Sequence, residues 1–114
     1  MKKRFLHLID SIDYSTPRII TATFPSSNAT FNKMLTIIDY HAPTNISTQE
    51  NEATTIQFYD DIQKVIHNNQ DHLIILLGDT NARLGKQSTK AAYQGKYTIG
   101  TRNLNGCHFA YFLE

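Results

Sequence analysis

The residues best suited to chemistry follow a run of five consecutive apolar residues, 73–77, and form the segment Gly78-Asp79-Thr80-Asn81. If the chain stays extended there, Asp79 and Asn81 point the same way, because side chains alternate along a strand. A carboxylate beside an amide can orient or deprotonate a water molecule and fix a phosphate oxygen. Metal-assisted hydrolysis of phosphate esters needs both tasks.

The same four residues also fit an ordinary turn, since Asp and Asn favour turns and Gly78 lets the backbone bend tightly. Calcineurin-like phosphatases also carry a Gly-Asp pair at the end of a strand. The segment therefore does not identify a family by itself.

A second candidate, His41, opens the segment His41-Ala42-Pro43-Thr44. Pro43 disfavours helix and lacks a donor for a strand ladder, so this segment is predicted to be a loop. The imidazole of His41 could donate to a phosphate oxygen or carry a proton near neutral pH. The alternative is a partly exposed loop histidine.

Two β-type runs, 17–24 and 31–40, flank a short polar loop and predict an antiparallel hairpin. Apolar residues at three- and four-residue steps then predict an amphipathic helix over about 51–68. Ser47 followed by Glu50 has the spacing of a capping box, and Asn68-Asn69 suits the helix end.

The run 73–77 has no polar residue, which predicts an interior strand that is covered on both faces. From residue 81 to about 101 the sequence is typical of loops, and residues 105–113 are predicted to begin another helix.

The chain has 114 residues, of which 40% are hydrophobic and 18% charged, and this fits one globular domain at most. Its net charge of +1 is too small for the protein as a whole to attract nucleic acid, so any recognition of nucleic acid would have to be local. The single cysteine, Cys107, excludes an internal disulfide, and we expect it to be a small buried side chain without a disulfide-linked partner. We expect an intracellular protein, because neither a signal peptide nor a membrane span is apparent.

Taken together, the motifs resemble the endonuclease/exonuclease/phosphatase superfamily, in the branch of RTE-type non-LTR retrotransposons and craniofacial development protein 2. The similarity covers about residues 10–114. Five segments carry it in order: Arg18-Ile19-Ile20-Thr21-Ala22, Leu35-Thr36-Ile37-Ile38 with His41-Ala42-Pro43-Thr44, Phe58-Tyr59-Asp60, Gly78-Asp79-Thr80-Asn81-Ala82 with Gly85, and Gly100-Thr101-Arg102-Asn103-Leu104-Asn105-Gly106.

The resemblance implies an α/β fold, a four-layer sandwich of two packed β-sheets flanked by helices, of which residues 1–114 would be one partial domain incomplete at both ends. It implies a phosphodiesterase that uses Mg²⁺, with Mn²⁺ as the alternative, and acts on nucleic acid, by analogy DNA. Asp79 would handle the attacking water, and Asn81 would contact the scissile phosphate and the metal site. His41 would support the phosphate, and Arg102 and Asn103 lie in a loop that could bind substrate; a solvated or structural arginine is the alternative for Arg102.

Two parts of the family's site have no counterpart here: the upstream Asn and Glu motifs and the downstream Ser-Asp-His segment. We therefore expect the isolated chain to be marginally folded and an inefficient nuclease. An inactive retroelement-derived remnant that acts as a binding or scaffold piece is one alternative reading. A phosphatase for a small phosphorylated molecule is another.

Overall fold

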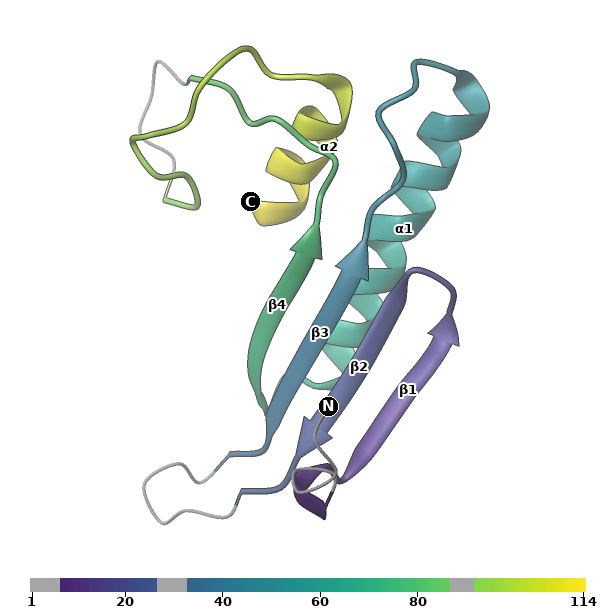
Figure 1. Cartoon of the computed structure of the whole chain (residues 1–114), viewed down its shortest axis with the longest axis vertical. Helices are drawn as coiled ribbons and strands as arrows, with labels where there is room; N and C mark the ends of the chain where they lie inside the picture. Colours follow the sequence, from purple (N-terminus) through teal and green to yellow (C-terminus); the bar gives the residue numbers. More distant parts are fainter. Residues whose placement is uncertain (1–6, 27–32, 87–91) are drawn as a thin grey trace. The chain divides into compact units, whose positions relative to one another are not determined.

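A computed structural model describes residues 7–26, 33–86 and 92–114 as a mixed α/β structure (Figure 1). One sheet has the strand order β1-β2-β3-β4. The elements follow along the chain as β1 (Ser11–Thr16), β2 (Ile19–Phe24), β3 (Leu35–His41), α1 (Gln49–Asn68), β4 (Leu73–Asp79) and α2 (Leu104–Leu113).

The predicted antiparallel hairpin is confirmed as the pair of β2 and β3, with a register that runs from Ile19 opposite Tyr40 to Phe24 opposite Leu35. Residues 31 and 32 of the second predicted run lie outside the described residues. Strand β1, which the sequence analysis did not predict, pairs antiparallel with β2 and shifts its register between Asp13 and Thr16. The sheet therefore extends one strand further than expected.

Strand β4 lies beside β3 and runs in the same direction, since α1 carries the chain back between them (Figure 1). The Leu73 amide donates to the Met34 carbonyl oxygen at the start of the pair, and the Ala42 amide donates to the Asp79 carbonyl oxygen at its end, both at 2.8 Å. This parallel pair brings the end of β3 and the end of β4 to the same edge of the sheet.

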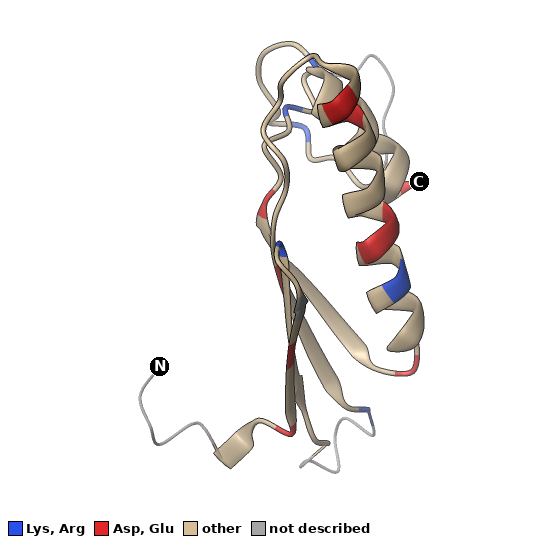
Figure 2. Ribbon diagram, turned by 90° about the vertical axis from the view of Figure 1, so that its right-hand side faces the viewer, with Lys and Arg blue, Asp and Glu red and all other residues tan. Residues whose placement is uncertain are grey.

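The prediction that the apolar run is covered on both faces is wrong for this chain. Strand β4 is an edge strand, and three alternate side chains, Leu73, Ile75 and Leu77, are 48%, 41% and 50% exposed. The C-terminal end of helix α1 lies on one face of the sheet (Figure 2), where Val65 and Asn68 line a hollow together with Thr21. An apolar strand without alternation is thus left half uncovered.

Helix α1 spans the predicted range, but its N-cap differs from the prediction. The Asn51 amide donates to the hydroxyl of Thr48 at 3.2 Å, so Thr48 caps the helix in place of Ser47. At the other end, the side-chain amide of Asn69 donates to the Val65 carbonyl oxygen at 2.8 Å. This bond satisfies one of the free carbonyls of the last turn.

The chain divides into two compact units, Met1–Tyr40 with Ile62–Gly78, and His41–Asp61 with Asp79–Glu114. In the first unit, Ile38 and Ile62 have no exposed surface. The core of the second unit is aromatic. Its rings lie 5.0–6.3 Å apart, within the range of favourable ring contacts, and belong to Phe58, Tyr59, Phe109 and Phe112.

The predicted final helix is confirmed as α2, and the described residues between 81 and 101 contain neither helix nor strand, as expected; residues 87–91 lie outside the description. The expectation that Cys107 is buried is wrong, because this side chain is exposed on α2. Across the described ranges, no helix is both long and apolar enough to cross a membrane.

Candidate functional site

The candidate site begins where β4 ends, at Asp79. One carboxylate oxygen of Asp79 accepts the backbone N–H of Asn81 at 2.8 Å and forms a local turn. Asn81 has a φ of +46°, in the left-handed region. The chain therefore does not stay extended, and the expected parallel orientation of Asp79 and Asn81 does not occur. The side chain of Asp79 is exposed, and its second oxygen is not used by this turn.

Asn81 turns toward the end of β3. Its side-chain nitrogen donates to the Ala42 carbonyl oxygen at 2.8 Å. An asparagine amide has two N–H donors and one acceptor oxygen. One N–H and the oxygen remain available to a ligand, so Asn81 both joins the two strand ends and keeps some capacity to bind phosphate or water.

Gly78 allows the two strand ends to approach closely. Its φ is +150°, and a Cβ at this position would collide with the carbonyl oxygen of Tyr40. Gly78 is therefore required by the close backbone contact as well as by its conformation.

His41 is the last residue of β3, and its side chain is exposed. The next residue, Ala42, is fully buried and donates its amide to the Asp79 carbonyl oxygen at 2.8 Å. Since neighbouring strands lie about 5 Å apart, the backbones of His41 and Asp79 are close neighbours at one sheet edge. The parallel pairing therefore places these two motifs beside each other, a neighbourhood that the sequence analysis did not predict.

Asn103 connects the loop after β4 with the start of α2. Its side-chain oxygen accepts the backbone N–H groups of Gly106 and Arg83, each at 2.8 Å, so that it caps α2. A Cβ at Gly106 would collide with the Arg83 carbonyl oxygen, which explains the glycine in a helix. These contacts give Asn103 a structural task, and its predicted contact with substrate is untested.

The sequence analysis assigned no role to Asn105, whose bonds join three segments of the site. It is only 2% exposed. Its side-chain nitrogen donates to the carbonyl oxygens of Pro43 at 2.8 Å and of Asn81 at 3.3 Å. Its backbone N–H donates to the side-chain oxygen of Asn45 at 3.0 Å. The sequence feature that could have indicated this role is a polar residue followed by glycine at the start of an otherwise apolar helix.

Arg102 is exposed, and its Nε donates to the Leu84 carbonyl oxygen at 2.9 Å. This bond uses one of the five N–H donors of the guanidinium group. The bond therefore joins the two segments of the loop, 83–86 and 94–102, at one end.

The described residues do not form a complete magnesium site. Asp79 and Asn81 supply one carboxylate and one amide oxygen, and the part of the chain that the structure describes contains no group of three or more His, Cys, Asp or Glu residues able to hold a metal. Mg²⁺ requires six oxygen ligands in near-octahedral geometry, of which several are commonly waters.

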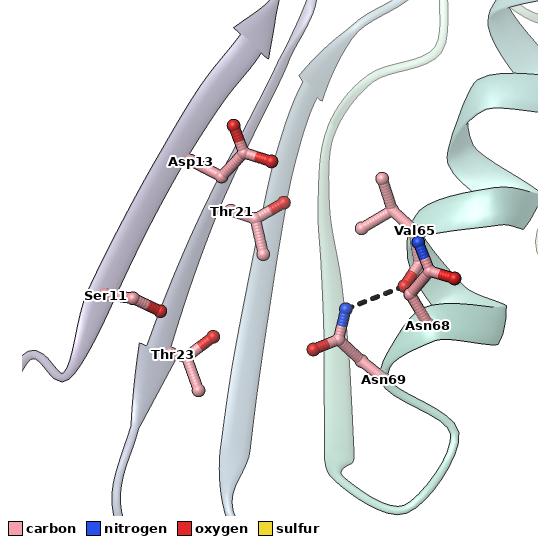
Figure 3. A pocket seen from close by; sticks show the side chains of 7 residues that line it. All are labelled: Ser11, Asp13, Thr21, Thr23, Val65, Asn68 and Asn69. Atoms are coloured by element: carbon pink, nitrogen blue, oxygen red, sulfur yellow. Dashed lines mark hydrogen bonds between the residues drawn. The ribbon is translucent and has the colours of Figure 1, made fainter.

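A separate polar hollow of about 250 Å³ lies in the first unit, between β1, β2 and the end of α1 (Figure 3). Its lining is Ser11, Asp13, Thr21, Thr23, Val65, Asn68 and Asn69. None of the predicted site residues lies there. Thr21 and Thr23 face it from β2 and are almost fully buried.

Comparison with known protein families finds no family that matches this sequence, and comparison with curated proteins finds no matching protein.

Proposed function

We propose that this chain supplies the phosphate-handling part of a phosphodiesterase that acts on nucleic acid, by analogy DNA. One observation carries the proposal: the three loop motifs of the resemblance meet in one hydrogen-bond network. The network joins Asn81 to Ala42 and Asn105 to both Pro43 and Asn81. Segments 24 to 62 residues apart in the sequence thus meet within the second unit.

In this proposal Asp79 orients and deprotonates the attacking water through its second carboxylate oxygen. The turn formed with the Asn81 N–H fixes the orientation of the carboxylate, as a catalytic base requires. Asn81 donates its remaining N–H to a phosphate oxygen. His41, exposed at the neighbouring strand end, donates to the same phosphate group or carries a proton.

Mg²⁺ is the proposed cofactor, with Mn²⁺ as its substitute, and Asp79 and Asn81 are its proposed ligands in this chain. Because these two side chains fall short of a full ligand set, we expect weak metal binding and inefficient cleavage by the chain alone.

We also propose that the sheet belongs to a four-layer α/β sandwich. The support is the apolar face of the sheet opposite α1. Its side chains are 41–51% exposed and belong to Ile12, Ile20, Leu73, Ile75 and Leu77. A second sheet packed on this face would bury these side chains, as in a β-sandwich core.

Metal and phosphate binding can be measured without relying on turnover. In ¹⁵N–¹H NMR spectra, added Mn²⁺ is expected to broaden the amide signals of Asp79, Asn81 and Ala42 first, and more strongly when thymidine 5′-monophosphate is present. Asp79→Asn is expected to abolish this effect, whereas Asp71→Asn, at another exposed aspartate, is expected to preserve it.

A plasmid-nicking assay with Mg²⁺ complements the spectra. We expect at most slow nicking that disappears in EDTA and in the Asp79→Ala variant. Equal broadening around Asp71 and Asp79, or nicking that survives Asp79→Ala, would contradict the proposed function.

A further inference from the structure

The charges of this chain are unevenly distributed. Residues 80–113 contain five cationic side chains and no Asp or Glu, whereas residues 1–79 contain six cationic and nine acidic side chains. The five cations are Arg83, Lys86, Lys90, Lys96 and Arg102. The near-neutral total therefore hides a strongly basic segment that directly follows Asp79.

The structure places the segments that carry four of these cations side by side, while Lys90 lies outside the described residues. The Lys86 amide donates to the Gly100 carbonyl oxygen at 3.2 Å, and Arg102 Nε donates to the Leu84 carbonyl oxygen at 2.9 Å. The side chain of Gln94 adds a bond to the Gly85 carbonyl oxygen at 2.6 Å. Residues 83–86 thus lie along residues 94–102, and we call these two segments the cationic loop.

The side chains of the four described cations are all exposed, and so is an aromatic ring among them. Tyr97 is 84% exposed, and Lys96 Nζ lies 4.9 Å from the centre of its ring. An exposed ring on a loop gains little from the core of its own protein. It can, however, stack on a nucleobase, and each such contact contributes substantially to binding of single strands.

We propose that the cationic loop binds single-stranded nucleic acid, with Lys86, Lys96 and Arg102 on the phosphates and Tyr97 stacked on a base. The inference rests on the proposed function for its ligand class. A nucleic acid strand offers both the anions and the flat apolar faces that this loop can bind, whereas an acidic peptide offers only the former. A duplex would keep its bases stacked and unavailable to Tyr97.

The loop is also attached to the candidate site. The Asn103 amide donates to the Arg83 carbonyl oxygen at 3.2 Å, and Asn103 Nδ2 lies 3.5 Å from the Asn81 carbonyl oxygen. A strand held on the cationic loop would therefore lead toward Asp79. This arrangement makes the loop a substrate-positioning surface of the proposed site.

The test is fluorescence anisotropy of a fluorescein-labelled oligothymidine with the full chain in EDTA, where no metal-dependent cleavage occurs. We expect Tyr97→Ala to weaken binding roughly 5- to 150-fold and Tyr97→Phe to bind like the parent. The double variant Lys86→Gln, Lys96→Gln is expected to lower the slope of log K against log salt by roughly 1.4, since each released counterion contributes about 0.7 for single strands. Lys33→Gln, an exposed lysine of the first unit, is the matched control.

Three outcomes would overturn the inference: unchanged affinity in Tyr97→Ala and in the double lysine variant, equal loss in Lys33→Gln, or binding to phosphatidylserine-containing vesicles without binding to the oligonucleotide. Circular dichroism of each variant shows whether lost binding reflects lost folding. If the chain does not bind oligothymidine while Mn²⁺ still broadens the Asp79 region, the proposed role of the cationic loop is contradicted and the proposed function is not. If the oligothymidine binds but Mn²⁺ does not broaden the Asp79 region, the proposed hydrolysis is contradicted and the cationic loop is still a binding site.

Discussion

The side-chain amide of Asn105 donates a hydrogen bond to the carbonyl oxygen of Pro43 at 2.8 Å, although the two residues are 62 positions apart. Pro43 is itself fully buried, so its carbonyl oxygen has little access to water. The bond therefore satisfies a buried acceptor that would otherwise be costly, and it fixes the loop after β3 against the start of α2.

Replacing Asn105 with Ala is expected to lower the free energy of unfolding by roughly 1–3 kcal/mol, because the Pro43 carbonyl loses its partner in a buried environment. Urea unfolding followed by circular dichroism measures this loss. Asn68→Ala serves as the control, since Asn68 is exposed and should change stability by less than about 0.5 kcal/mol. Equal unfolding midpoints for the two variants would show that the bond is energetically unimportant.

Gly78→Ala is expected to destabilise the chain by roughly 1–3 kcal/mol or more, because the new Cβ would meet the Tyr40 carbonyl oxygen at a φ of +150°. Gly95→Ala is a matched control, since a Cβ at that position has no neighbour within 4 Å. Thermal melts of both variants make the comparison. If Gly78→Ala melts at the parent temperature, the close approach of β3 and β4 does not exist in solution.

Two substitutions at Asn81 distinguish the contribution of its backbone conformation to stability from that of its side-chain hydrogen bond. Asn81→Gly keeps the left-handed conformation available and removes only the amide bond to Ala42, a loss of about 0.5–1.5 kcal/mol. Asn81→Ala is expected to cost roughly 1–2 kcal/mol more, because a Cβ disfavours a φ of +46°. Denaturant unfolding gives both values, and equal stability of the two variants would contradict the left-handed conformation.

The uncovered apolar face of the sheet is expected to drive self-association of the isolated chain and binding of the dye ANS. Ile75→Lys should reduce both effects with little change in secondary structure, because Ile75 is 41% exposed on that face. Ile46→Lys adds the same charge at a loop residue that is 53% exposed, and it is expected to leave self-association unchanged. Sedimentation velocity measures association; similar behaviour of the two variants would argue against the sheet face as the cause.

The elements with a clear periodic pattern could be predicted from the sequence. The hairpin of β2 and β3 and both helices follow from apolar spacing and turn residues. Strand β1 could not be predicted so readily. It is a short edge strand whose apolar residues, Ile12 and Tyr14, are 50% and 75% exposed. Two exposed apolar residues are too few to predict a strand from their spacing.

The prediction that β4 is buried was wrong because an apolar run indicates that a strand is more stable when both faces are covered. It does not indicate which layers are present to cover them. The site shows the same limit. The placement of His41 and of Asp79 next to strand ends follows from local signals, whereas the pairing of the two strands does not. The turn at Asn81 is local and was one of the two interpretations of the sequence, but the bonds of the Asn81 and Asn105 side chains reach across 39 and 62 positions. Such bonds leave no local trace in a single sequence.

The parallel pairing of β3 with β4 has a consequence for folding kinetics. Because α1 separates these strands in the sequence, they can pair only after a long loop has closed, and closing such loops slows folding. The bonds of Asn105 require a longer closure still. We therefore expect the hairpin and α1 to form early, and the loops that carry His41, Asp79 and Asn105 to become ordered last.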